Sequence, residues 1–327
     1  MSAFDEHPNI GLELLRVTEA AAMAAAPWVG RGAKQAANAS AIDAMHAFLQ
    51  TVDIEAVIIR GEGASSDNPV LFDGERVGRG GPFAGDIALD AIDGIGPTAS
   101  GRPNAISVVA MVEKGSMVDD LAVAYVNKLA VGPDGVGVVA ITETPTRNLH
   151  ALAHATGRTI RDLTAVVLDR QRHAELIAEI RSSGARLRLV ADDDVGAAVS
   201  TALIGTGADI LFGIGGSREA IISAAALRGL GGQQQVQLRP QDDAEHRAIQ
   251  DAGRDLDAVL SISDLVGTGA CYFAATGITD GDLLHGVRLD DDFIWTHSLV
   301  TQAQPTVVRH IRARHRRSPL SSSCPSG

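Results

Sequence analysis

Apolar residues recur at helical spacing in the first fifty positions of the chain. The spacing predicts one helix over residues 9–26, which ends before Pro27, and a second helix over residues 34–52. The apolar positions of these helices are Ile10, Leu14, Val17 and Ala21 in the first, and Ile42, Met45 and Leu49 in the second. Each helix therefore has an apolar face that must pack against another element.

Beyond these helices, short apolar runs predict strands. The predicted strands are 56–59, 87–89, 105–112 and 123–131, followed by a turn at 132–135 and a strand at 136–142. The chain then alternates, with helices at 148–156, 173–183, 195–204 and 217–230 and strands at 164–169, 186–190 and 209–212. This alternation favours an α/β protein in which helices cover a mostly parallel sheet.

The remaining segments are more polar. Residues 231–257 are rich in Gln and Asp and predict an excursion at the surface. Residues 309–317 contain five arginines and two histidines, which could bind a phosphate, but a solvated helix or a fraying end is favoured. Residues 318–327 are rich in Ser and Pro and predict a disordered tail.

Composition narrows the class of protein. With 327 residues, 45% of them hydrophobic, the chain can bury a large core in one domain or in two coupled halves. A net charge of −12 argues against general nucleic-acid binding, and 3% aromatic residues are too few for stacking platforms.

Cys271 and Cys324 have neither disulfide-framework nor zinc spacing. Asp5 and Glu6 precede the alanine run at 20–26, which argues against a signal peptide. We expect a soluble cytoplasmic protein that binds no membrane.

Two segments end strands with carboxylates beside glycines. The run from Gly85 to Gly94 reads as a strand that presents Asp90 and Asp93 just before a glycine turn, and Glu62 lies between two glycines. Buried carboxylates need hydrogen bonds or a cation. For either segment alone, a turn whose Asp caps a helix is equally compatible. Together the three residues favour a site for Mg²⁺ or Mn²⁺, which prefer carboxylate oxygens.

Other segments offer weaker signals. Residues 211–216 form a strand and a glycine loop before a helix that begins near Ser217, where backbone amides can hold a phosphate. Glu219 in that helix either serves the site or complements the helix dipole. His150 and His154 are spaced for metal binding, but a solvated helix face is favoured. The run 192–195 is similar to the aspartyl-phosphatase motif, although its following glycine argues against a nucleophile.

Taken in order, these segments resemble the class II fructose-1,6-bisphosphatases of bacteria, which are lithium-sensitive, inositol-monophosphatase-like sugar phosphatases. The resemblance covers nearly the entire chain, from Leu14 to the region 309–315. Its blocks are Trp28-Val29-Gly30-Arg31-Gly32, Gly61-Glu62-Gly63, residues 86–94, Lys128-Leu129-Ala130-Val131-Gly132-Pro133, Arg172-His173, residues 213–219 and Ala275-Thr276-Gly277-Ile278-Thr279 with Gly281-Asp282-Leu283-Leu284.

The resemblance implies a layered α-β-α-β-α fold of two coupled halves and metal-assisted hydrolysis of a sugar phosphate. Residues 1–134 would be an α+β half with the metal site, and residues 135–317 an α/β half with the sugar-phosphate pocket. Metal ions, Mg²⁺ or Mn²⁺, would bind the phosphate and orient a water for in-line attack. The implied metal-site and catalytic carboxylates are Glu62, Asp90, Asp93 and Glu219. The implied substrate-binding residues are Gly94, Tyr125, Arg170, Arg172, Asp192, Asp194 and Gly215. The family also implies a homodimer or homotetramer.

The chain departs from the family pattern at several positions. Ala33 stands in place of an acidic metal-site residue, Ile95 in place of the threonine that helps activate the water, and Gly96 in place of an arginine. Asp93 replaces a glutamate, and Arg170 replaces a lysine. These departures leave three hypotheses: a divergent phosphatase for another sugar phosphate, a catalytically impaired relative that binds a sugar phosphate, and an ordinary fructose-1,6-bisphosphatase of gluconeogenesis.

Overall fold

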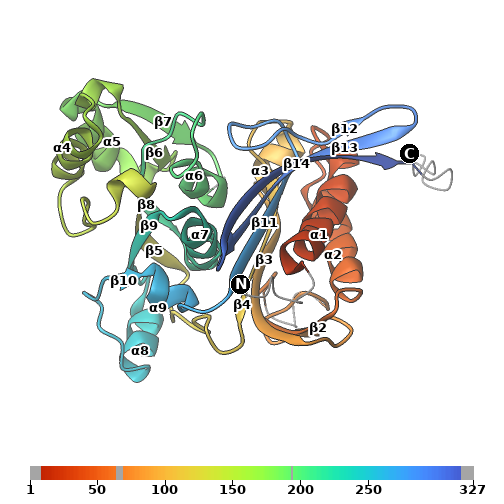
Figure 1. Cartoon of the computed structure of the whole chain (residues 1–327). Helices are drawn as coiled ribbons and strands as arrows, with labels where there is room; N and C mark the ends of the chain where they lie inside the picture. The colour runs from red at the N-terminus through yellow and green to blue at the C-terminus, as the bar shows by residue number, and fades with distance from the viewer. Residues whose placement is uncertain (1–8, 64–68, 193, 318–327) are drawn as a thin grey trace, which may run out of the picture.

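Helices and sheets alternate as five layers in the computed structural model of the chain, which describes residues 9–63, 69–192 and 194–317 (Figure 1). Helices α1 and α2 cover one face of a first sheet. Helix α7 contacts both this sheet and a second one, and α4 and α5 pack on the far face of the second sheet. The α-β-α-β-α arrangement confirms the predicted fold class.

The first sheet takes strands from both ends of the described chain. Its order is β12-β13-β11-β4-β3-β1-β2, and β14 pairs with β13 at the edge. The bounds are β1 (Ile54–Arg60), β2 (Arg76–Val77), β3 (Phe83–Asp93), β4 (Ile106–Glu113), β11 (Cys271–Gly277), β12 (Arg288–Leu289), β13 (Phe293–Ala303) and β14 (Thr306–Arg316). Residues 271–316 thus return to the sheet that residues 54–113 begin. The division into halves at residue 134 stays a prediction.

The second sheet has the order β10-β9-β5-β8-β6-β7. Its bounds are β5 (Tyr125–Val131), β6 (Thr164–Leu168), β7 (Arg186–Val190), β8 (Ile210–Gly216), β9 (Gln233–Leu238) and β10 (Leu260–Ser261). Only the pairs β6–β7 and β6–β8 of this sheet are parallel, whereas β5 pairs antiparallel with both β8 and β9. The prediction of a mostly parallel sheet was therefore wrong.

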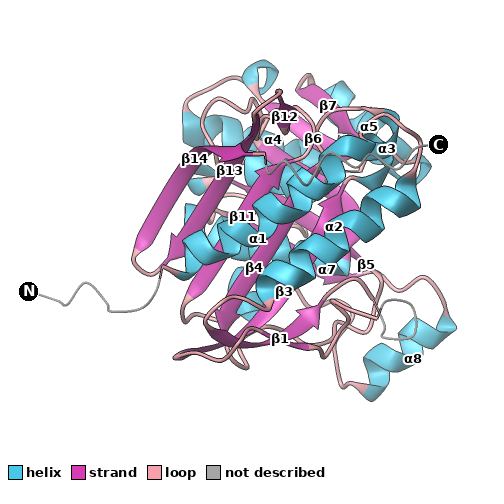
Figure 2. Cartoon of the chain, turned by 90° about the vertical axis from the view of Figure 1, so that its right-hand side faces the viewer, coloured by secondary structure: helices cyan, strands magenta, loops and turns pink. Residues whose placement is uncertain are grey.

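The helices fill the spaces between and outside the sheets. Their bounds are α1 (Ile10–Ala25), α2 (Lys34–Leu49), α3 (Ile95–Ser100), α4 (Pro145–Thr156), α5 (Ala174–Ser183), α6 (Asp194–Ser200), α7 (Ser217–Leu230), α8 (Asp243–Asp251) and α9 (Ile262–Val266), with short 3₁₀ turns at Ala26–Trp28, Pro133–Gly135, Ile160–Asp162 and Gln171–His173. Helices α1 and α2 lie side by side across the first sheet (Figure 2).

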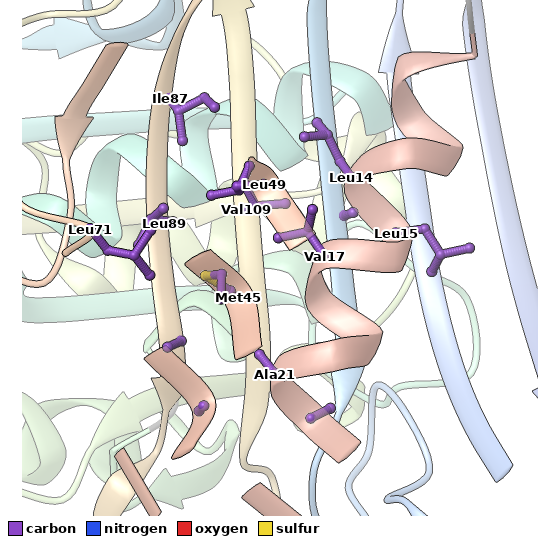
Figure 3. Close-up of a cluster of buried hydrophobic side chains, with 14 of the residues drawn as sticks. Leu14, Leu15, Val17, Ala21, Met45, Leu49, Leu71, Ile87, Leu89 and Val109 are labelled. Atoms are coloured by element: carbon purple, nitrogen blue, oxygen red, sulfur yellow. The ribbon is translucent and has the colours of Figure 1, made fainter. Parts of the chain in front are cut away.

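The apolar faces predicted for the first two helices form the outer core. Leu14 and Val17 of α1 and Met45 and Leu49 of α2 are fully buried. They belong to one cluster with Ile87, Leu89 and Val109 of the first sheet (Figure 3). A second cluster joins the other face of that sheet to α7, and two more lie on the faces of the second sheet. The layers are therefore joined by hydrophobic burial on every sheet face.

Residues 136–142 were wrongly predicted as a strand. Gly137 has a left-handed backbone with φ 73°, and the Val138 amide donates to the Gly135 carbonyl in a turn. The amides of Gly137 and Ile141 donate to the side-chain oxygens of two glutamines on β9, with N–O distances of 2.6 and 2.7 Å. Turn hydrogen bonds and glutamine side chains, rather than a neighbouring strand, thus satisfy these amides.

Two polar segments are more ordered than the sequence indicates. Residues 231–257 include β9 inside the second sheet and α8, instead of an excursion alone. Gln234 of β9 is fully buried, and its side chain bonds to Ser223 and to the Ala220 carbonyl. Residues 309–317 belong mainly to β14, which is neither a helix nor a frayed end. The tail predicted at 318–327 lies outside the described residues.

In the part of the chain that the structure describes, no helix is long and apolar enough to cross a membrane.

Leu14 provides a test of the outer core. Replacing Leu14 with Ala should lower the free energy of unfolding by about 2–5 kcal/mol, because a fully buried leucine leaves a cavity between α1 and the sheet. Urea denaturation measures this loss. The matched change Leu289→Ala, at a side chain that is 47% exposed, should stay within about 0.5 kcal/mol of the wild type. Equal effects of the two changes would contradict the assigned packing.

Candidate active site

A bulge in β3 brings two predicted carboxylates to one side of the first sheet. Residues three apart in a regular strand point to opposite faces. Asp90 is paired with Val108 and Asp93 with Ile106, so three steps on β3 oppose two on β4. This extra residue shifts the alternation, as a β-bulge does. Both aspartates, 5% and 3% exposed, can then face the space between the sheets.

Three of the four predicted metal-site carboxylates converge on Arg218, the second residue of α7. Its Nη2 lies 2.7 Å from Asp90 Oδ2 and 3.2 Å from Glu219 Oε1. Its Nη1 lies 3.9 Å from Glu62 Oε2 and donates to the Gly61 carbonyl at 2.9 Å. The bulged strand, the loop after β1 and the start of α7 thus meet at one guanidinium.

Backbone amides hold the other oxygens of two of these carboxylates. The Ala91 amide donates to Glu62 Oε1 at 2.8 Å, and the Ile92 amide donates to Asp90 Oδ1 at 3.0 Å. Each side chain therefore has one oxygen on the backbone of β3 and the other toward Arg218. This arrangement fixes the carboxylates in orientation before any ligand arrives.

The charges in this cluster are unevenly compensated. Burial, reinforced by the nearby Asp90, raises the pKa of Glu62 to about 7. Burial also raises the pKa of Asp90, against the opposing effect of Arg218. For Glu219, burial alone would raise the pKa, but Arg218 and Lys128 outweigh it and lower the value. Arg218 is one positive charge beside three carboxylates, and the raised pKa values of Glu62 and Asp90 indicate that it does not fully compensate their burial.

A second ion pair borders the cluster. Lys128 of β5, 2% exposed, donates through Nζ to Asp194 at the start of α6, and to the Gly216 carbonyl at 3.3 Å. A side chain at Gly215 would overlap the Asp194 carboxylate, and one at Gly216 would overlap the Glu219 carboxylate. Glycine at the end of β8 is therefore required for these acidic groups to approach the backbone.

A cavity of about 410 Å³ opens beside these groups and gathers most of the predicted substrate-binding residues. It is lined, among others, by Asp93, Tyr125, Arg170, Arg172, Asp192, Asp194, Gly215, Arg218 and Glu219. Arg172 lies over the Tyr125 ring at 5.3 Å and donates to the Ile214 carbonyl at 2.8 Å. Arg170 forms an ion pair with Asp192. Glu62 lies instead on a neighbouring cavity of about 630 Å³, which Arg218 also lines.

The carboxylates around Arg218 have donor groups that a divalent metal could use. Within residues 9–63, 69–192 and 194–317, no three His, Cys, Asp or Glu side chains are already grouped as metal ligands. The carboxylates are arranged around Arg218 instead. Their chemistry nevertheless fits a hard cation such as Mg²⁺ or Mn²⁺, because the donors are carboxylate oxygens and three carboxylates share one guanidinium.

Comparison with known proteins gives the family. The model described as "Bacterial fructose-1,6-bisphosphatase, glpX-encoded" matches residues 8–315. The chain is 35% identical over 320 residues to "Fructose-1,6-bisphosphatase 1 class 2" of Escherichia coli (strain K12), which covers 94% of this chain and 95% of that protein. It is equally similar to "Fructose-1,6-bisphosphatase class 2" of Shigella flexneri.

The chain belongs to the class II fructose-1,6-bisphosphatase family. This confirms the resemblance found in the sequence, and it places the chain among the phosphoric monoester hydrolases. The roles of individual residues stay predictions.

Three of the five departures from the family pattern lie in or near α3. Ala33 is the N-cap residue of α2. The loop that precedes Ala33 is joined to α3 by two hydrogen bonds, from the Gly30 amide to the Thr98 carbonyl and from the Gly32 amide to the Ala99 carbonyl. Ile95 begins α3 and packs against the outer core cluster. A Cβ at Gly96 would lie 2.7 Å from Asp192 Oδ2, so glycine leaves room for the Arg170–Asp192 pair.

Sequence reasoning missed Arg218 and Lys128 as site residues, although both carry a signal. Lys128 is a charged residue inside an apolar strand, and buried lysines are almost always paired. Arg218 lies in the first turn of a helix, where the helix dipole disfavours a cation. A compensating acidic cluster could therefore be expected opposite it. By contrast, His150 and His154 are exposed on α4, as predicted.

Glu62 makes the stability of the metal-free protein depend on pH. In the folded chain this group stays protonated up to about pH 7, and in the unfolded chain only up to its ordinary value of 4.5. The folded state binds more protons between these values. Its contribution to stability is complete below about pH 4.5 and is lost as the pH rises to about 7.

Replacing Glu62 with Gln, which resembles the protonated form, should remove the loss of stability that occurs as the pH rises to about 7. Relative to the wild type, the variant should gain up to about 3 kcal/mol of unfolding free energy near pH 8 in the presence of a chelator. Denaturation curves at several pH values measure the difference. Glu55→Gln, at an exposed position of β1, is the control. Parallel pH profiles of the wild type and Glu62→Gln would contradict the assigned environment.

Proposed function

We propose that the chain hydrolyses a phosphate monoester on a sugar phosphate or bisphosphate that differs from fructose 1,6-bisphosphate. The observation that supports this most strongly is the cavity that Asp93 and Glu219 share with Arg170 and Arg172. Acidic groups suited to a cation and basic groups suited to a phosphate line the same space. Membership in the family supports sugar-phosphate hydrolysis in general.

The residues around this cavity would have separate roles in binding the substrate and the cation. Arg172, held by the Ile214 carbonyl and the Tyr125 ring, is oriented to bind an anionic group of the substrate. Glu62, Asp90, Asp93 and Glu219 would hold the divalent cation. When bound, Mg²⁺ or Mn²⁺ would supply positive charge to the phosphate and orient a water for attack. Burial excludes bulk water from the aspartates and so strengthens these electrostatic effects.

A second cavity supports the altered substrate. It measures about 440 Å³ and shares Arg170 and Asp192 with the first cavity. Lys34, Gly96 and Arg102 also line it. A substrate longer or differently branched than fructose 1,6-bisphosphate would find room and positive charge there. Gly96, in place of the family arginine, removes a side chain that would press on Asp192.

The second candidate function is a catalytically impaired protein that binds a sugar phosphate. Ala33 and Ile95 favour it, because the first brings no carboxylate and the second brings no hydroxyl to the site. An ordinary fructose-1,6-bisphosphatase is the third possibility. We also propose that the protein is a cytoplasmic homodimer or homotetramer, as the family resemblance implies. The buried free thiol of Cys271 is compatible with a reducing compartment.

Phosphate release from a panel of sugar phosphates, with Mg²⁺ or Mn²⁺, tests the proposal. We expect turnover of at least one compound, and Glu219→Gln should lower kcat by at least about 10²-fold because a charged group of the site is lost. Glu175→Gln, at an exposed position in the first turn of α5, should leave kcat unchanged. Binding of a sugar phosphate by the folded protein without any turnover would favour the impaired relative.

Restoring the family residues should recover fructose-1,6-bisphosphatase activity. Ile95→Thr returns a hydroxyl and Ala33→Asp returns a carboxylate to the same site, so their effects should be non-additive. We expect each single change to give little and the double change to exceed the product of the single gains by about tenfold or more. Initial rates with Mg²⁺ or Mn²⁺ measure this.

Two matched controls separate chemistry from stability in that experiment. Because Ala33 makes no side-chain cap to α2, an Asp there would also stabilise the helix by about 0.5–2 kcal/mol. Ala33→Asn caps equally well but brings no carboxylate, and Ile95→Val keeps the branched shape without the hydroxyl. A folded double variant that gains no more than Ala33→Asn with Ile95→Val would show that the pocket serves another ligand.

A further inference from the structure

Arg218 occupies the position that the carboxylate cluster offers to a cation. We propose that its guanidinium is a tethered cation that competes with the divalent metal, so that the metal binds only where Arg218 has moved away. This inference rests on the proposed function, in which Glu62, Asp90 and Glu219 are metal ligands. It assigns to Arg218 a positioning role that controls metal affinity.

The hydrogen-bonding geometry supports competition for the same oxygens. Glu62 Oε1 and Asp90 Oδ1 each accept a backbone amide of β3. Arg218 approaches the second oxygen of each residue, at 3.9 Å from Glu62 Oε2 and 2.7 Å from Asp90 Oδ2. A metal ion at the cluster would need the same oxygens and would face a fixed positive charge.

Glu219 completes the contact from the other side. Its Oε1 lies 3.2 Å from Nη2 and 3.3 Å from Nε of Arg218, so the guanidinium uses Nε, Nη1 and Nη2 on acidic or carbonyl oxygens. The acidic side chains are 6–20% exposed and Arg218 is 28% exposed. An ion pair buried to this extent is not an incidental surface contact.

Arg218 has room to leave the cluster. It lines both the cavity of about 410 Å³ and the cavity of about 630 Å³, and therefore forms part of the wall between them. Movement of the side chain into either space would take the guanidinium away from Asp90 Oδ2 and Glu62 Oε2. In the smaller cavity the guanidinium would join Arg170 and Arg172, which line the same space.

Mn²⁺ binding to the full chain tests the proposal without reference to turnover. The wild type and Arg218→Met are titrated with Mn²⁺, and free Mn²⁺ is followed by its electron paramagnetic resonance signal. Removing the competing charge should tighten Mn²⁺ binding by at least about tenfold. The variant should also lose thermal stability in a chelator and regain more of it than the wild type on addition of Mn²⁺.

Two further variants keep the test decisive. Arg60→Met breaks the ion pairs with Asp73 and Asp120 beside the larger cavity but leaves the cluster intact, and its Mn²⁺ affinity should equal that of the wild type. Arg218→Lys keeps the positive charge but lacks the planar guanidinium that contacts several oxygens at once. Its affinity for Mn²⁺ should lie between those of the wild type and Arg218→Met. If Arg218→Met does not fold without metal, folding restored by Mn²⁺ supports the proposal, and Arg218→Lys supplies the affinity comparison.

Unchanged or weaker Mn²⁺ binding in both Arg218 variants would overturn the proposal. Phosphate release is measured on the same samples to separate this result from a failure of the proposed function. Tighter Mn²⁺ binding by the Arg218 variants, with no turnover in any sample, would support competition between Arg218 and the metal but contradict the proposed phosphatase activity. Turnover with unchanged Mn²⁺ affinity would support the phosphatase activity but contradict the competition.

Discussion

Repulsion between carboxylates that are buried together is the constraint on which this site depends. Asp90 and Glu62 end neighbouring strand regions, Glu219 begins a helix, and all three lie where water is largely excluded. Bringing such groups together is unfavourable without positive charge. The structure meets this cost in part with Arg218 and in part with backbone amides of β3. Because three carboxylates share this single guanidinium, the cluster is suited to a divalent cation.

The architecture places these groups by joining two sheets through α7. The helix packs against both sheets, and its first turn carries Arg218 and Glu219 to the bulged end of β3. The glycines at the end of β8 allow the acidic groups to approach. Beside this junction lies the cavity with Arg170 and Arg172, on the connection after β6. The hydrophobic clusters on the sheet faces fix the helices and the two sheets relative to one another. The geometry of the site therefore depends on how the layers pack.

Many elements could be predicted from the sequence, because α1 and α2 have apolar residues at helical spacing and the central strands are apolar runs, whereas the layered arrangement was implied by the family resemblance. β9 was missed because glutamines interrupt its apolar alternation, although Gln234 is buried through side-chain hydrogen bonds. β14 was missed because both of its faces carry Arg or His. The carboxylates were found by their positions at strand ends. Their contact with Arg218 was not, because it joins residues 128 positions apart through the docking of α7, which no local pattern specifies.

The central claim is that the cluster of Glu62, Asp90 and Glu219 binds a divalent cation next to a sugar-phosphate pocket. The most direct measurement is an anomalous-scattering map from crystals soaked with Mn²⁺ and a sugar phosphate. We expect a Mn²⁺ peak in contact with these carboxylates, the Arg218 guanidinium moved away from Asp90, and a phosphate beside the metal in the cavity that Arg172 lines. A cluster without Mn²⁺ at saturating concentration, with Arg218 still bonded to Asp90, would contradict it.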